Sequence, residues 1–133
     1  VPVANLKRRP EPDKWSAHEH ACHLTDGDEM FLARLDRMLS DPHTRIQSIT
    51  PTPGEQAGAL LSVDLDDALR QYERNRARLV ARLKELSAED WMRTAEHEAF
   101  SHYSVYVMFR HLLMHEMLHA YRIDEILARK DWD

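Results

Sequence analysis

The sequence predicts an all-α fold, in which long helices pack as an antiparallel bundle. Three observations support this fold class. The chain of 133 residues has only three glycines, too few for the hairpin turns of a β architecture. Leu, Ala, Arg and Glu, which favour helices, are abundant. Apolar residues recur at intervals of three or four over three long segments, which is the period of a helix face that packs against a core.

The first half of the chain predicts an extended lead-in, one helix and a long loop. Residues 1–14 contain three prolines and no helical period, so we expect them to be extended. Ser16, with Glu19 three residues later, forms a capping box from which a helix over about 16–40 begins. Residues 41–62 contain prolines and little periodicity, which predicts a loop. Loops of this length often form a lid or part of a site.

The second half predicts two further long helices. The first, over about 64–86, has a polar middle at residues 73–78 that should face water. Its buried stripe consists of Leu65, Leu69, Tyr72, Leu79, Leu83 and Leu86. Ser87 to Asp90 are typical of the cap of a short extra turn. The last helix, about 104–129, would be roughly 39 Å long. Its inward face combines apolar residues with two histidines, namely Met108, Leu112, His115, His119, Ile123 and Ile126.

Length and composition indicate a single domain over residues 1–133. With 43% hydrophobic residues the chain has enough apolar side chains for one core. The formal net charge is −5, and acidic residues alternate with Arg along the predicted helices. Nucleic acid is therefore not an expected partner, because phosphate binding needs a clustered basic face.

Cysteine usage and hydropathy predict a cytoplasmic protein that has no membrane partner. Cys22 is the only cysteine, so an intramolecular disulfide is excluded, and we expect its side chain to pack in the core. No apolar stretch approaches the roughly 18–20 residues that span a bilayer, and no segment resembles a signal peptide. The chain begins at Val1 and not at Met, which leaves room for an upstream segment.

His115 and His119 are the strongest candidates for metal ligands. Four residues apart on a helix, they lie about 40° apart around its axis and one turn apart along it, so two ring nitrogens can reach one ion. Alternatively, both are core histidines with backbone or carboxylate partners. Their position on the apolar stripe favours the metal, because one ion satisfies two side chains that are costly to bury unpaired.

His23 is the candidate for the third ligand. It lies on the inward stripe of the first long helix, where Gly27 leaves room one turn later, and His20 competes with it. Three imidazoles leave positions on the ion for water or substrate. The ion is one divalent metal, with Zn, Ni, Fe, Mn and Cu as candidates. His18 and His43 are expected at the surface. His97 and His102, in the loop before the last helix, either line the opening of the site or have no role in it.

Three motifs follow one another along the chain, namely Lys14-Trp15-Ser16 with Glu19, His23-Leu24, and His111-Leu112-Leu113-Met114-His115-Glu116-Met117-Leu118-His119. With these motifs the chain resembles the DinB/YfiT superfamily of four-helix-bundle metalloproteins, described as metal-dependent hydrolases and thiol transferases. The similarity extends from Leu6 to about Leu127. The resemblance implies a DinB-like four-helix bundle, a metal ion bound by His23, His115 and His119, and often a homodimer.

The start of the chain departs from the family pattern. In this family a helix normally precedes the Trp-Ser start, whereas a Pro-containing lead-in does so here. We therefore expect either that a first helix is missing from the given chain or that this member differs. A missing helix would expose an apolar groove for a dimer partner or the lost segment to cover.

The resemblance also implies reactions on a small-molecule substrate. Family members transfer thiols such as bacillithiol, mycothiol or glutathione to electrophiles, or isomerise maleylpyruvate with such a thiol, so a low-molecular-weight thiol is a second expected cofactor. The ion would lower the pKa of a water or a thiol. Glu19 and Glu116 are the candidate catalytic residues. Glu19 would orient an imidazole or take a proton, or else cap Ser16, and Glu116 would reach the reacting water or face solvent.

Several other functions remain open. A non-catalytic binding or stress-response protein would use the metal for stability alone. His115-Glu116-Met117-Leu118-His119 also matches H-E-x-x-H, in which the glutamate is the general base of a zinc protease. A protease is disfavoured because no histidine follows His119 and because no strand is expected that could hold a peptide substrate. A di-iron site needs a second Glu-x-x-His pair, which the chain lacks, and a bis-histidine haem site stays open.

Overall fold

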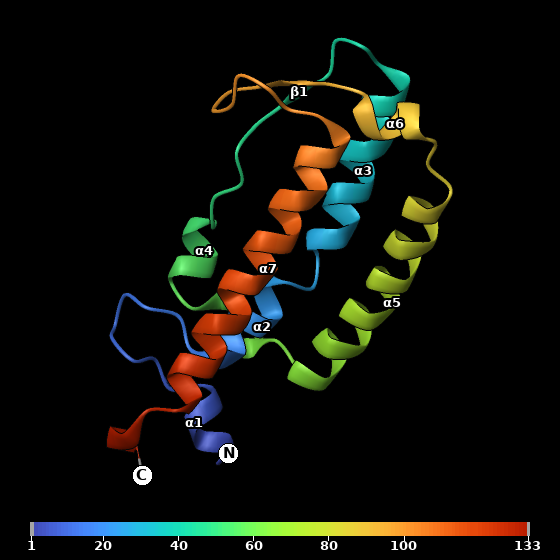
Figure 1. Cartoon of the computed structure of the whole chain (residues 1–133). Coiled ribbons are helices and arrows are strands. Elements are labelled where there is room, and N and C mark those ends of the chain that lie inside the picture. The colour runs from blue at the N-terminus through green and yellow to red at the C-terminus, as the bar shows by residue number, and fades with distance from the viewer. Residues whose placement is uncertain (1, 133) are drawn as a thin grey trace.

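Helices account for most of the computed structural model, which describes residues 2–132 (Figure 1). The main helices are α2 (Ala17–His23), α3 (Gly27–Ser40), α5 (Leu65–Lys84) and α7 (Val105–Leu127). The short elements are α1 (Val3–Leu6), β1 (Arg45–Ile46), α4 (Pro53–Gln56), η1 (Ala59–Ser62), α6 (Ala88–Met92), β2 (Glu96–His97) and η2 (Lys130–Trp132), of which η1 and η2 are 3-10 helices. The expected all-α class is confirmed. No helix in the described part of the chain combines the length and apolarity needed to cross a bilayer.

The helix α7 runs antiparallel to α3 and α5, whereas α3 and α5 run in the same direction (Figure 1). Two contacts establish these directions. The strand β1, just after α3, pairs with β2, just before α7, so α7 starts where α3 ends. The turn η1, just before α5, contacts α2, so α5 starts at the end of the bundle where α2 lies. Residues 41–64 therefore run back along the bundle from the end of α3 to the start of α5. This crossover explains why the connection between the two helices is long.

The single helix expected over 16–40 is divided into α2 and α3. The predicted capping box of Ser16 and Glu19 begins α2. Between the two helices, the side chain of Asn75 from α5 donates to the carbonyl of Thr25 at 2.9 Å. The carbonyl of Thr25, at the break between the two helices, thus receives a hydrogen bond from a side chain of another helix. The prediction that residues 73–78 face water is wrong for Asn75, which is fully buried.

Two segments that were expected to lack regular structure contain short helical turns. The predicted lead-in, residues 1–14, includes α1, and the predicted loop, residues 41–62, includes α4 and η1. Two-residue strands and their pairing also contradict the expectation of no strand. These elements are too short to produce a recognisable hydrophobic period. By contrast, α5, α6 and α7 begin at the capping residues Asp64, Ser87 and Ser104, within one residue of the predicted starts.

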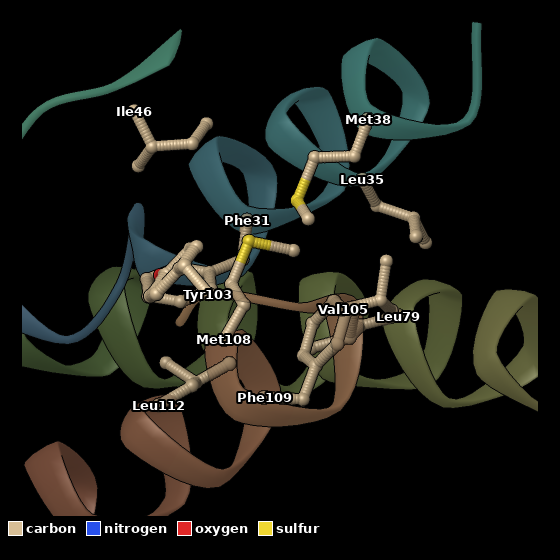
Figure 2. Packing of buried hydrophobic residues seen from close by; sticks show 10 residues of the cluster. All are labelled: Phe31, Leu35, Met38, Ile46, Leu79, Tyr103, Val105, Met108, Phe109 and Leu112. Carbon is tan, nitrogen blue, oxygen red and sulfur yellow. The ribbon is translucent and has the colours of Figure 1, made fainter. Parts of the chain in front are cut away.

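The main hydrophobic core lies between α3, α5 and α7 (Figure 2). Its fully buried members include Leu35, Met38, Val105 and Met108. In Figure 2 the side chains of Met108 and Leu112 from α7 lie beside Phe31 and Tyr103. The stripe predicted for α5 is wrong at one position, because Leu69 is 49% exposed while Ala68 beside it is buried.

The outward face of α7 is apolar and exposed. Its residues are between 49% and 61% exposed and comprise Tyr106, Leu113, Met114, Met117, Leu118 and Tyr121. Charged residues such as Arg110 and Arg122 are also exposed on α7, but a cluster of exposed apolar side chains is typical of a contact surface. We refer to these six residues as the outer face of α7.

Candidate metal centre

Three histidines from two helices meet where α2 packs against α7. His23, near the end of α2, and His115 and His119, on α7, each offer one ring nitrogen, and the three nitrogens lie within 4.8 Å of one another. The spacing of four residues brings the two rings of α7 together as expected, since Nε2 of His115 and Nε2 of His119 are 3.0 Å apart. The structure therefore brings together the three side chains that the sequence predicted as metal ligands.

The donor atoms and their environment fit a divalent ion. Two imidazole nitrogens on one tetrahedral ion, with bonds of 2.0–2.1 Å, lie roughly 3.3 Å apart, close to the 3.0 Å between His115 and His119. Burial lowers the pKa of His115, and the charge of His23 lowers it further. Burial also lowers the pKa of His119 to about 3. These two rings are therefore neutral near pH 7, which is the form that binds metal ions.

His20, which the sequence left as a competitor of His23, contacts His119 instead. The two Nδ1 atoms are 2.7 Å apart, so one ring donates and the other accepts. Burial lowers the pKa of His20 to about 4, which keeps it neutral and able to accept. When Nδ1–H of His119 donates to His20, the lone pair of His119 is on Nε2, the nitrogen that faces His115.

Glu55, on α4, is a residue of this region that sequence reasoning missed. Its Oε1 accepts from Nδ1 of His23 at 3.3 Å, and its Oε2 accepts from the backbone N–H of Thr52 at 2.7 Å. Burial alone would raise the pKa of Glu55, but the hydrogen bonds from Thr52 and His23 outweigh it and lower the pKa. The available sequence signal was the capping box that Thr52 and Glu55 form around Pro53, inside the predicted loop.

Glu19 is held by the lead-in and by its own helix cap. Its fully buried carboxylate accepts from the backbone N–H of Ser16 at 2.8 Å and from the guanidinium of Arg9 at 2.5 and 3.0 Å. Burial alone would raise the pKa of Glu19, but the hydrogen bonds from Arg9 and Ser16 lower it overall. Of the two roles expected from the sequence, capping is the one that these contacts support.

Glu116 lines the cavity that reaches His23 and His115, and its carboxylate is paired with side chains of α5. Arg76 of α5 donates to both of its oxygens, once at 3.1 Å, and the hydroxyl of Tyr72 donates to it at 3.2 Å. Arg76 also pairs with the buried carboxylate of Asp28 at 2.7 and 2.9 Å. Because this network engages both oxygens of Glu116, a role as the general base of H-E-x-x-H chemistry would require the carboxylate to release these donors.

Cavities lie on two sides of the three histidines. One, of about 340 Å³, reaches His23 and His115 and has an apolar wall made by Leu24, Met30, Phe31, Ile49, Leu60 and Leu112. The other, of about 600 Å³, reaches His119 and His20 and has charged residues at its edge, including Lys14 and Arg122. Cavities of this size accommodate small molecules.

The remaining histidines and the cysteine lie outside the group of three. His18, predicted at the surface, is buried, and its Nε2 lies 3.0 Å from the carbonyl oxygen of Leu60. His43 is exposed and Cys22 is buried, as expected. The ring of His97 packs 4.5 Å from that of Tyr103, and neither His97 nor His102 lines the two cavities.

Comparison with known proteins agrees with this fold. The family model of the DinB superfamily matches residues 1–123. The structure is similar to YfiT from Bacillus subtilis, described as "a probable metal-dependent hydrolase with an unusual four-helix bundle topology", with a TM-score of 0.67, 17% identity, and coverage of 96% of this chain and 75% of that chain. No curated protein matches the sequence significantly. Because the family model covers nearly the whole chain and the fold is shared, this chain belongs to the DinB superfamily.

Proposed function

We propose that this protein binds one divalent metal ion through His23, His115 and His119 and uses it in a hydrolase or thiol-transferase reaction on a small molecule. The observation that carries the proposal is the convergence of three ring nitrogens within 4.8 Å. The description of YfiT as a probable metal-dependent hydrolase supports the hydrolase alternative. The two cavities support access by a substrate.

The second nitrogens of two rings indicate which atoms would bind the ion. Nδ1 of His23 faces Glu55 and Nδ1 of His119 faces His20, which leaves Nε2 of each ring available. Three imidazole ligands are typical of catalytic sites that keep a coordination position open, and here two of the three rings have outer partners that orient them. A bound divalent ion is a Lewis acid that lowers the pKa of a water or thiol. Zn, Ni, Fe and Mn are all compatible with this donor set.

The cavity beside His23 and His115 suggests the general character of the substrate. Its wall combines apolar side chains with the imidazoles of His23 and His115 and with further polar residues, namely Asp26, Thr50, Thr52, Glu55 and Glu116. The chain can therefore exclude water from the body of a ligand while a polar group of that ligand reaches the histidines. We infer a small substrate with an apolar body and one polar, electrophilic or thiol group.

Elemental analysis of purified protein tests the metal site before any reaction is assumed. We expect one metal ion per chain in the unmodified protein and in His43→Ala, because His43 is exposed and distant from the group. His115→Ala should lose the ion while remaining helical by circular dichroism. The proposal would be overturned if the unmodified protein bound none of the four metals after dialysis against each.

A non-catalytic, metal-stabilised protein is the second candidate, and the burial of His119 favours it, since that ring is only 8% exposed. The two functions differ in whether the ion accepts an external ligand. Adding a small thiol to cobalt-loaded protein should change the visible absorption spectrum if a coordination position is open. An unchanged spectrum would favour the purely structural role.

A further inference from the structure

Residues 49–62 form one wall of the cavity that reaches His23 and His115. This segment includes α4 and η1 and contacts α2. Its cavity-lining residues are Ile49, Thr50, Thr52, Glu55 and Leu60. Any molecule that approaches the two imidazoles from this cavity therefore passes beside the segment.

The position of this segment depends on polar contacts more than on apolar burial. None of residues 49–62 is buried. Side chains from the start of the chain instead donate to its backbone carbonyls, as Lys7 does to Leu61 at 2.8 Å and Trp15 does to Glu55 at 3.3 Å. Few buried apolar groups and many exposed hydrogen bonds are features of segments that open locally.

One contact joins this segment to the metal centre itself. Oε1 of Glu55 accepts from Nδ1 of His23 at 3.3 Å. A carboxylate in this position keeps the proton on Nδ1 and the lone pair on Nε2, and it makes the ring a better ligand. We propose that Glu55 is a positioning residue, which couples metal binding at His23 to the docking of residues 49–62. This inference rests on the proposed metal site.

The coupling acts in both directions because linkage is reciprocal. The docked segment presents Glu55 to His23 and thereby raises the affinity for the ion. A bound ion holds the His23 ring in the orientation in which its Nδ1–H donates to Glu55, and it thereby stabilises the docked segment. The segment is a wall of the cavity, so loading the metal would also complete the chamber in which a substrate binds.

The two oxygens of Glu55 have separate roles that mutation can distinguish. Oε2 caps α4 by accepting from the N–H of Thr52 at 2.7 Å, while the hydroxyl of Thr52 accepts from the N–H of Glu55 at 3.2 Å. Thr52→Ala weakens the cap and leaves Oε1 free for His23. Glu55→Gln keeps the size of the side chain but removes its charge. If Glu55 acted only on local structure, these variants would behave alike.

Three measurements test the coupling. Zinc affinity, determined by competition with a chromogenic chelator, should fall about 10- to 100-fold in Glu55→Gln and much less in Thr52→Ala. Nitrogen-15 shifts of His23 should show a protonated Nδ1 in the unmodified protein and in Thr52→Ala, and a mixture of tautomers in Glu55→Gln. Hydrogen exchange of residues 49–62 should slow when zinc is added to the unmodified protein.

The outcomes separate this inference from the metal site on which it rests. Absence of zinc binding by the unmodified protein overturns the proposed function. Zinc binding that is unaffected by Glu55→Gln, or that leaves the exchange of residues 49–62 unchanged, overturns the coupling alone. The exchange measurement needs no variant, so the inference stays testable even if a substitution prevents folding.

Discussion

Nδ1 of His20 lies 2.7 Å from Nδ1 of His119, although 99 positions separate the two residues in the chain. This contact joins α2 to α7, and on its other side the ring of His119 lies 3.0 Å from that of His115 through their Nε2 atoms. His119 thus has one nitrogen for a neighbouring ring and one for the proposed ion. We therefore expect metal binding to depend on His20, which is not itself one of the three proposed ligands.

Replacing His20 should weaken metal binding without abolishing it. His20→Leu removes the acceptor for Nδ1–H of His119, so we expect zinc affinity to fall about tenfold. His20→Asn retains an acceptor oxygen and should lose less affinity. Competition with a chromogenic chelator measures both, with His43→Leu as a surface control. Unchanged affinity in His20→Leu would mean that this contact does not orient His119.

The low pKa values of two histidines, the buried His119 and the partly buried His20, predict that the metal-free protein loses stability as the pH falls. Burial lowers the pKa of His20 to about 4 and that of His119 to about 3, whereas an unfolded histidine titrates near 6.5. Between these values the unfolded chain binds more protons than the folded chain. The free energy of unfolding therefore decreases toward acid pH, by at most about 1.4 kcal/mol per pH unit for each histidine.

Urea denaturation in the presence of a chelator measures this effect between pH 6.5 and pH 5. That window lies above the usual range of carboxyl groups, so the histidines dominate the change. His20→Asn should reduce the slope of stability against pH, and His43→Asn should leave it unchanged. A stability that does not vary over this window would contradict the lowered pKa values of His20 and His119.

The long helices were predictable because their determinants are local. Capping residues and apolar periodicity lie within each segment, so the start of α7 at Ser104 needs no tertiary information. The break between α2 and α3 is different. It is stabilised by Asn75, which lies 50 positions from Thr25, its partner. The apolar period continues across the break, so the sequence alone predicts one helix.

The same distinction applies to the candidate metal centre. His115 and His119 were predictable because a spacing of four on a helix fixes their relative position. His23 followed from its place on an apolar stripe and from the family resemblance. The contact of Glu55 with His23 was not predictable, because it depends on how a crossover of about twenty residues packs against α2. Contacts of this kind are set by tertiary structure and leave no periodic pattern.

The buried ion-pair network around Arg76 predicts a large loss of stability on mutation. Asp28 is 1% exposed and pairs with Arg76, which also holds Glu116. Arg76→Met would leave the carboxylate of Asp28 buried without a partner, which costs about 3–5 kcal/mol. Arg78→Met, on the same helix, removes only an exposed pair with Glu29 and should cost under about 1 kcal/mol. Equal effects in urea denaturation would show that Asp28 finds another partner.

The outer face of α7 predicts self-association into a homodimer. Leu113, Met117 and Tyr121 are 57–61% exposed and follow one side of the helix, and apolar patches of this kind mark interaction surfaces. Pairing α7 with α7 of a second copy would bury them. Met117→Lys should therefore shift the sedimentation coefficient from dimer to monomer, because a charge at the centre of the face is costly to bury. Val80→Lys, at an exposed apolar residue of α5, should leave the association unchanged. A monomer at all concentrations of the unmodified protein would contradict the prediction.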